Sequence, residues 1–399
     1  MERCIVVVDD STEFLVMVEL ALEPIATERH LQILHASSGE EALALLANNP
    51  NAAVLLTDLA MPRMDGLALI TQCRRQYPLL QSVVLSGASD ARSIIEALRA
   101  GASDYIVKPP SIAELETSLS NALARYEELE QTFRTRERLQ TYERELAIAA
   151  EIQRHMLPPS QVRDPDEQYR LAALLVPARH VAGDFYDHWV TGDGRIVMIV
   201  GDVSGKGVSA ALWMAVTKTL LRSHLEHESS PVEAMEATNR ALAMNNPQAY
   251  FVTAVVAIFD PEEGLLSMCN AAHPSPYHIR HDGAVERLPT IPGMPLGALE
   301  DTRYHCTTVE IAPNDRILMY TDGILDALTE DLSAQQSALG NLIRQTSTAT
   351  DIIASIIAQL SQLWIGQSLP DDVTLLQMDY CPTELSTQKV ATSEAIERG

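Results

Sequence analysis

The middle of this chain contains no glycine and no proline between Ser111 and Leu157, and this stretch constrains the fold more than any other feature. Apolar or small residues recur along it in alternating steps of three and four, while charged residues fill the other positions. Such spacing predicts one long helix with a heptad-like apolar seam, which ends before Pro158 and Pro159. The seam consists of Ile112, Leu115, Leu119, Ala122, Tyr126, Leu129 and Phe133 and, beyond an interruption at Arg136, of Leu139, Tyr142, Leu146 and Ala149.

Two explanations of the apolar seam are open. The helix can be a connector that packs on the domains of its own chain, or it can pair with a second copy as a parallel coiled coil. Because so long an apolar stripe is unfavourable in water, we favour a homodimer formed through this helix.

Short apolar runs alternate with amphipathic helical patterns from residue 3 to about residue 120. Five runs are strand candidates, namely RCIVVVDD, LQILHAS, AAVLLTD, SVVLSG and DYIVKPP. Repeated βα units predict an α/β domain with a five-stranded, parallel, doubly wound sheet. Ligand chemistry is then expected at the carboxyl ends of the strands.

Acidic and polar side chains follow these strands. Asp9 and Asp10 end the first candidate and Asp58 ends the third, so a parallel sheet would bring three carboxylates into one crevice. Such a cluster is costly unless a hard divalent cation such as Mg²⁺ neutralises it. Ser86 closes the fourth strand, and Lys108 closes the fifth before a proline.

In the order of these residues, this segment resembles the receiver domain of bacterial response regulators. The resemblance implies that Asp58 accepts a phosphoryl group and that Asp9 and Asp10 bind Mg²⁺ together with it. Ser86 and Lys108 would hold the phosphoryl oxygens, and the aromatic side chain of Tyr105 would act as a switch.

From about residue 160 to 380 the pattern becomes mixed α and β. Asp202 lies there in VGDVSGKGVS, whose lysine invites comparison with a phosphate-binding P-loop. That motif has the form G-x-x-x-x-G-K-[ST], whereas here three residues separate Gly201 from Gly205 and Gly207 follows Lys206. The loop is therefore not predicted to bind a nucleotide.

Aspartates beside strand-like runs form a second acidic set. Glycine next to several of them lets the backbone approach closely, so that a carbonyl can also ligate. Carboxylates and carbonyls without thiolates or clustered imidazoles suit Mg²⁺ or Mn²⁺, and two such ions can activate a water and screen a phosphate. The resulting hypothesis is a metal-dependent phosphate-ester hydrolase. The set is Asp184, Asp202, Asp322, Asp371 and Asp372.

GDFYD, GDVSGKG, FVTAVVAIFD, NAAHPSP, MPLG, LMYTDGILDA and DDVTLL occur in this order. They resemble the PPM-class serine/threonine phosphatases of the SpoIIE/RsbU branch, which implies an α+β fold with a β-sandwich flanked by helices. By this resemblance Asp184 and Asp202 bridge or bind both metal ions, and the Val203 carbonyl ligates one of them. Asp322 and Asp371 bind the other ion, and Asp372 is a supporting or alternative ligand.

The group that protonates the leaving oxygen is open. Ser204 stands where eukaryotic relatives carry a histidine proposed as the general acid, and a serine hydroxyl is too weak an acid near neutral pH. His273 is one candidate, although a buried structural histidine is the simpler explanation. Arg179 could orient the phosphate or be an ordinary surface residue. Lys206 could attract the phosphate or only cap the chain where it enters the next helix.

The composition indicates which partners and which compartment are expected for this chain. A formal charge of −25 argues against nucleic acid or an anionic membrane as a partner. Five cysteines form no C-x-x-C pair, which predicts reduced thiols in a cytoplasmic protein. The chain begins almost directly with a strand candidate, so no signal peptide is expected, and no apolar run approaches membrane-spanning length.

The predicted parts are a receiver domain (1–120), a helical coiled-coil linker (121–157), a PPM-type phosphatase domain (158–382) and a disordered tail (383–399). The predicted protein is a two-component response regulator whose receiver, phosphorylated by a cognate sensor histidine kinase, controls the phosphatase. The expected substrate is a phosphorylated STAS-domain anti-anti-sigma factor. The alternative is a catalytically silent adaptor whose receiver switches binding to a sigma-factor or anti-sigma pathway protein.

Overall fold

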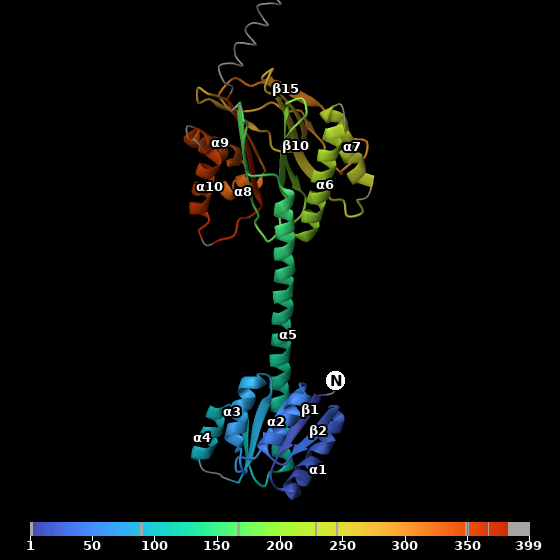
Figure 1. The fold of residues 1–399 in the computed structure, drawn as a ribbon, viewed down its shortest axis with the longest axis vertical. Helices are drawn as coiled ribbons and strands as arrows, with labels where there is room; N and C mark the ends of the chain where they lie inside the picture. Colours follow the sequence, from blue (N-terminus) through green and yellow to red (C-terminus); the bar gives the residue numbers. More distant parts are fainter. Residues whose placement is uncertain are drawn as a thin grey trace, which may run out of the picture. The chain divides into compact units, whose positions relative to one another are not determined.

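The computed structural model describes residues 3–87, 91–165, 168–227, 230–244, 246–347, 349, 351–365 and 367–381. The chain divides into two compact units, Met1–Tyr142 and Glu143–Gly399 (Figure 1). The predicted tail over residues 383–399 lies outside the described residues. None of the helices in the described part of the chain has both the length and the apolar content needed to cross a membrane.

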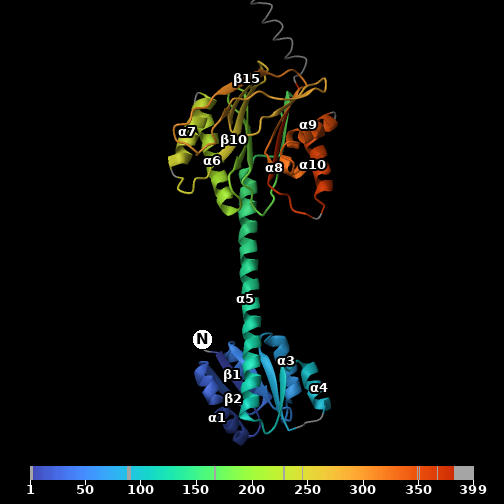
Figure 2. The same cartoon turned by 180° about the vertical axis from the view of Figure 1, so that it is seen from behind.

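The N-terminal unit is an α/β domain built on one sheet of five parallel strands, in the order β2-β1-β3-β4-β5. Helices cover both faces: α1 and α5 share one apolar cluster with the strands, and α2 and α3 share another (Figures 1 and 2). This confirms the predicted doubly wound fold. The elements are β1 (Arg3–Val8), α1 (Thr12–Glu28), β2 (Leu31–Ala36), α2 (Gly39–Asn48), β3 (Ala52–Thr57), α3 (Gly66–Gln76), β4 (Gln81–Ser86), α4 (Ala91–Ala100), β5 (Asp104–Val107) and α5 (Ile112–Met156).

The first part of α5 belongs to the core of the N-terminal unit. Leu115 and Tyr126 are at most 4% exposed and pack with α1 against the sheet. Arg3 of β1 forms ion pairs with Glu127 and Glu130 on the same helix. The connector explanation therefore holds for this part of the seam. The following seam residues are 37% to 61% exposed, namely Leu129, Phe133, Leu139 and Tyr142.

The C-terminal unit contains two six-stranded sheets. One has the order β14-β11-β10-β9-β8, with β15 paired to β11, and the other has the order β13-β12-β16-β17-β7-β6. The first sheet comprises β8 (Phe185–Val190), β9 (Ile196–Val203), β10 (Val252–Asp260), β11 (Leu265–Ala271), β14 (Pro292–Gly293) and β15 (Cys306–Glu310). The second comprises β6 (Gln161–Arg163), β7 (Tyr169–Val176), β12 (Tyr277–Ile279), β13 (Val285–Arg287), β16 (Arg316–Tyr320) and β17 (Val373–Tyr380).

Alternation along the strands builds the layers of this sandwich. In β9, Met198 and Val200 enter the cluster between the two sheets, while Val197 and Ile199 face the helices outside, because successive side chains of a strand point to opposite faces. Helices α6 (Val208–His227) and α7 (Pro231–Met244) cover the first sheet. Helices α8 (Gly323–Leu328), α9 (Gln335–Thr346) and α10 (Ile352–Leu363) cover the second (Figures 1 and 2). The predicted sandwich flanked by helices is confirmed.

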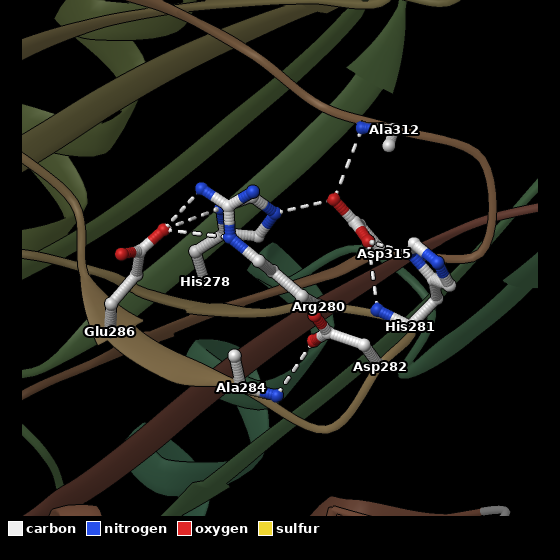
Figure 3. Close-up of polar contacts among 8 residues, drawn as sticks. All are labelled: His278, Arg280, His281, Asp282, Ala284, Glu286, Ala312 and Asp315. Carbon is white, nitrogen blue, oxygen red and sulfur yellow. Dashed lines mark hydrogen bonds and ion pairs between the residues drawn. The ribbon is translucent and has the colours of Figure 1, made fainter.

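A polar network ties the β12–β13 hairpin to the start of β16 (Figure 3). The buried Asp315 carboxylate accepts hydrogen bonds from His278 Nε2 at 2.7 Å and from the backbone N–H groups of His281 at 2.9 Å and Ala312 at 3.1 Å. Burial alone would raise the pKa of Asp315, but these hydrogen bonds hold it below its usual value. The charged carboxylate thus anchors the hairpin.

The cysteine prediction is wrong for one pair. Cys269 of β11 and Cys306 of β15 stand directly opposite each other and are joined in a disulfide. The remaining thiols, Cys4, Cys73 and Cys381, are free. Facing positions on antiparallel strands bring two side chains into reach, and the 37-residue separation in sequence does not reveal this register.

Candidate functional site

The carboxyl ends of β1 and β3 bring three aspartates together. Asp9 and Asp58 are buried, while Asp10 is exposed. Ligand oxygens of the three lie within 4.8 Å of one another, and no other trio of acidic, histidine or cysteine side chains in the described ranges does so. Three carboxylates at this spacing fit a hard cation such as Mg²⁺.

Lys108 neutralises part of this cluster from the end of β5. Its ammonium forms ion pairs with Asp9 and, at 3.1 Å, with Asp58 Oδ2. It also lies 4.1 Å from the centre of the Phe14 ring, a cation–π contact. The backbone N–H of Leu59 donates to Asp58 Oδ1 at 2.8 Å. An ammonium therefore orients one oxygen of Asp58 and a backbone N–H the other.

The two other receiver candidates follow neighbouring strands. Ser86 is buried at the end of β4, and its carbonyl accepts a hydrogen bond from the Lys108 N–H at 2.9 Å. This bond places the serine beside the lysine at the acidic edge. Tyr105 lies within β5, partly buried against the cluster of Ile70 and Ala97 between β4 and α4.

In the C-terminal unit, Asp184 precedes β8 and Asp202 lies in β9, and the charges of the two side chains interact. Burial and the charge of Asp202 raise the pKa of Asp184 well above its ordinary value. Burial and the charge of Asp322 raise the pKa of Asp202 to about 7. Burying adjacent carboxylates is costly without a cation, so this pair fits a divalent metal.

Two threonines that sequence reasoning missed orient Asp184. The hydroxyls of Thr321 and Thr374 each donate to Asp184 Oδ2 at 2.7 Å, and the Thr374 N–H donates to the Thr321 hydroxyl at 2.9 Å. One carboxylate oxygen is therefore saturated, which leaves the other for a ligand. The available signal was position, since Thr321 directly precedes Asp322 and Thr374 follows Asp372 by two residues.

The adjacent aspartates before β17 have different surroundings. Asp372 accepts the backbone N–H of Ala178 on one oxygen and that of Gly183 on the other, both at 2.7 Å. Asp371 instead presents Oδ2 to the Lys206 ammonium at 2.8 Å. These contacts make Asp372 a brace for the loop before Asp184 and leave Asp371 bound to a displaceable side chain.

Glycines permit the close contacts on which both acidic sites depend. A Cβ on Gly66 would lie 2.1 Å from the Asp58 carbonyl oxygen, and one on Gly323 would lie 1.8 Å from the Asp372 carbonyl oxygen. A Cβ on Gly183 would lie 3.2 Å from the Val203 carbonyl oxygen and 3.7 Å from Asp202 Oδ1. The Val203 carbonyl and the Asp202 carboxylate therefore lie together beside the residue that precedes Asp184.

The remaining candidates have structural contacts. His273 is buried, with Nε2 3.1 Å from the Tyr320 carbonyl and Nδ1 2.8 Å from the Thr253 hydroxyl. Burial lowers the pKa of His273 to about 4, so the ring is neutral. The Ser204 hydroxyl accepts the Phe251 N–H at 2.9 Å. Neither side chain is arranged as a general acid.

Arg179 lines a cavity of about 250 Å³ at the edge of the C-terminal acidic site. Lys206, Asp371 and Asp372 also line this cavity. It gives Asp371 and Asp372 an opening to solvent that two cationic side chains also line.

A further residue outside the predicted set lies on α5. The buried side chain of Gln153 bonds the backbone of Ala182, two residues before Asp184. The last turns of α5 thus contact the segment that positions a candidate metal ligand.

Two family models match separate parts of the chain. Residues 5–120 match the response regulator receiver domain, and residues 192–380 match Stage II sporulation protein E (SpoIIE). Protein IcfG of Synechocystis sp. is 28% identical over 263 residues, which cover 58% of this chain and 41% of IcfG. Phosphoserine phosphatase RsbU of Bacillus subtilis is 29% identical over 235 residues, which cover 58% of this chain and 69% of RsbU.

A solved structure supports the fold of the C-terminal unit. The SiaA-PP2C domain of Pseudomonas aeruginosa superposes with a TM-score of 0.53 at 23% identity, covering 61% of this chain and 98% of that domain. The chain spans less than half the length of IcfG, 41% of it. Taken with the two acidic sites, the matches show that this chain joins a response regulator receiver domain to a SpoIIE-type PPM phosphatase domain.

Proposed function

We propose that this protein is a metal-dependent protein serine/threonine phosphatase controlled by phosphorylation of its own receiver domain. The observation that carries the proposal is the buried pair of Asp184 and Asp202, whose charges interact with each other, with Asp322 and Asp371 close enough to act on Asp202. A similar relative, RsbU, is a phosphoserine phosphatase. Such a cluster costs stability in an adaptor that needs no metal.

The side chains of the C-terminal unit supply ligands and orientation. Asp184 and Asp202 would bind both Mn²⁺ or Mg²⁺ ions, the Val203 carbonyl would ligate one of them, and Asp322 and Asp371 would bind the other. Two ions bound here would lower the pKa of a water and screen the charge of a phosphate ester. The chain itself keeps these ligands in place, through the threonine hydroxyls on Asp184 and the backbone N–H groups on Asp372.

The receiver would accept its phosphoryl group on Asp58. Asp9 and Asp10 would bind Mg²⁺ together with Asp58, and the Lys108 ammonium already contacts Asp58 Oδ2. Ser86, at the end of the neighbouring strand, would bind another phosphoryl oxygen. Tyr105 of β5 would change its packing when the site is phosphorylated.

Helix α5 is the proposed route of control. It packs in the receiver core at one end, and through Gln153 it contacts the segment before Asp184 at the other. The exposed part of the seam between them is the proposed homodimer contact, because pairing would cover its apolar side chains. The proposed domain limits are residues 1–120, 121–157 and 158–382.

The proposed partners are a sensor histidine kinase that phosphorylates Asp58 and a phosphorylated STAS-domain protein as substrate. The decisive experiment measures phosphate release from a phosphoserine STAS protein with Mn²⁺, comparing the wild type with Asp202→Ala. We expect metal-dependent turnover that falls by at least about 100-fold in the variant, since a ligand for the reacting centre is lost. Release by neither protein would support the silent adaptor, whereas equal release by both would show that Asp202 is not a ligand of the reacting centre.

A further inference from the structure

Lys206 connects two loops at the opening of the C-terminal acidic site. It lies between Gly205 (φ +92°) and Gly207 (φ +83°), in the loop that leads from β9 to α6. Left-handed backbone on both sides, which glycine adopts without strain, turns this loop toward the segment before β17. The ammonium reaches Asp371 Oδ2 at 2.8 Å and the Pro370 carbonyl oxygen at 3.0 Å.

This contact is the one ion pair that the five candidate aspartates make within the described residues. Hydroxyls hold the Asp184 carboxylate instead, and backbone N–H groups hold that of Asp372. Lys206 and Asp371 are 45% and 38% exposed at the rim of the 250 Å³ cavity, so the pair can open without disturbing the core. An ion pair in such surroundings is weak and exchangeable.

We propose that Lys206 is a displaceable counter-ion and positioning residue of the phosphatase site. The ammonium holds Asp371 while no divalent cation is bound there. A cation on Asp371 releases Lys206, whose free ammonium then lies at the mouth of the cavity and attracts the phosphate of the incoming protein. The second step rests on the proposed phosphatase function, whereas the first concerns cation binding alone.

The first step predicts that removing the charge strengthens cation binding. Calorimetric titration of the full chain with Mn²⁺ alone should show Lys206→Met binding the ion at the Asp371 site about 2- to 5-fold more tightly than the wild type, because a competing surface ion pair is gone. Lys206→Arg keeps the charge and should resemble the wild type. Arg163→Met, on edge strand β6, controls for the general loss of one positive charge.

The second step predicts that Lys206→Met binds the phosphoprotein substrate more weakly, whereas it binds Mn²⁺ more tightly. The KM for a phosphoserine protein should rise about 3- to 10-fold in Lys206→Met, because one charge that attracts the phosphate is lost. A damaged site would weaken both kinds of binding, so tighter Mn²⁺ with a higher KM distinguishes this role from misfolding.

Two results would overturn the inference. Mn²⁺ binding by Lys206→Met that is no tighter than in the wild type or in Arg163→Met rules out the counter-ion role, whatever the phosphatase activity. Tighter Mn²⁺ binding with an unchanged KM rules out the attraction of phosphate. If neither protein releases phosphate but Lys206→Met still binds Mn²⁺ more tightly, the proposed enzyme is wrong and the counter-ion role stands.

Discussion

Gln153 and Ala182 exchange two hydrogen bonds: the side-chain amide donates to the Ala182 carbonyl at 2.7 Å, and its oxygen accepts the Ala182 N–H at 2.9 Å. The same α5 helix packs its opposite end in the core of the receiver. Because Ala182 is fully buried two residues before Asp184, a shift of the helix cannot leave this segment unaffected.

Gln153→Ala leaves the buried carbonyl and N–H of Ala182 without their hydrogen-bond partners. We expect the free energy of unfolding of the phosphatase unit to fall by about 1–3 kcal/mol, and Mn²⁺-dependent activity to fall because the Asp184 segment loses its support. Urea unfolding and phosphate release measure the two effects. Gln140→Ala, on the exposed face of the same helix, should change neither. Wild-type activity in Gln153→Ala would show that this contact does not position the ligand.

Thr374→Val tests the orientation of Asp184. Burial and the charge of Asp202 raise the pKa of Asp184, while the hydroxyls of Thr321 and Thr374 lower it. Removing one hydroxyl should therefore raise the pKa further, so that the ionised carboxylate forms only at higher pH. We expect the acidic limb of Mn²⁺ binding and of activity to move up by about one pH unit.

Thr217→Val is the matched control for the threonine test. Thr217 is also fully buried, but its hydroxyl has no hydrogen-bond partner in the part of the chain that the structure describes. Its replacement by an isosteric apolar side chain should leave the pH profile unchanged and the protein at least as stable. An equal pH profile in Thr374→Val and Thr217→Val would contradict the assigned role of the Thr374 hydroxyl.

The sequence predicted those parts of the site that lie at strand ends. Asp9, Asp58 and Asp202 each follow or end an apolar run, and the sheet then determines where they meet. The contacts between loops were not predictable, because the spacing of Thr374 or Lys206 from its partner in sequence carries no information about a tertiary contact. The disulfide between Cys269 and Cys306 was missed for the same reason.

The seam of α5 shows a different limit of sequence reasoning. Its period predicted the helix, but a buried face has the same period whether it packs on its own domain or on a second copy. Leu115 and Tyr126 pack on the receiver, while Phe133 and Tyr142 are exposed. Only the structure separates the two parts of the seam.

His273 should make stability depend on pH. Its pKa is about 4 in the folded protein because of burial, against an ordinary value of about 6.5. The neutral ring therefore contributes its full stability above about pH 6.5, and this contribution is lost as the pH falls toward 4, about 2 kcal/mol of it by pH 5. Urea unfolding at pH 7.5 and pH 5 measures this loss.

His273→Gln should be less stable than the wild type at pH 7.5 but lose about 2 kcal/mol less on going to pH 5. His305→Gln, at an exposed position, should keep the wild-type pH dependence. If His273 instead served as a general acid, its replacement would remove the basic limb of the activity profile. A pH dependence of unfolding that is the same in His273→Gln and the wild type would contradict a buried neutral ring.

A flexible Gly-Ser insertion after Arg136 tests whether α5 carries the signal from Asp58. Glycine costs about 1 kcal/mol per residue in a helix interior, so the insertion should break the helix where its residues are exposed. We expect Mn²⁺-dependent basal activity to remain and the response to receiver phosphorylation to disappear. An inserted Ala-rich heptad, which keeps the helix and the phase of the seam, should preserve the response. Regulation that survives the flexible insertion but not Asp58→Asn would mean that the signal passes through another route.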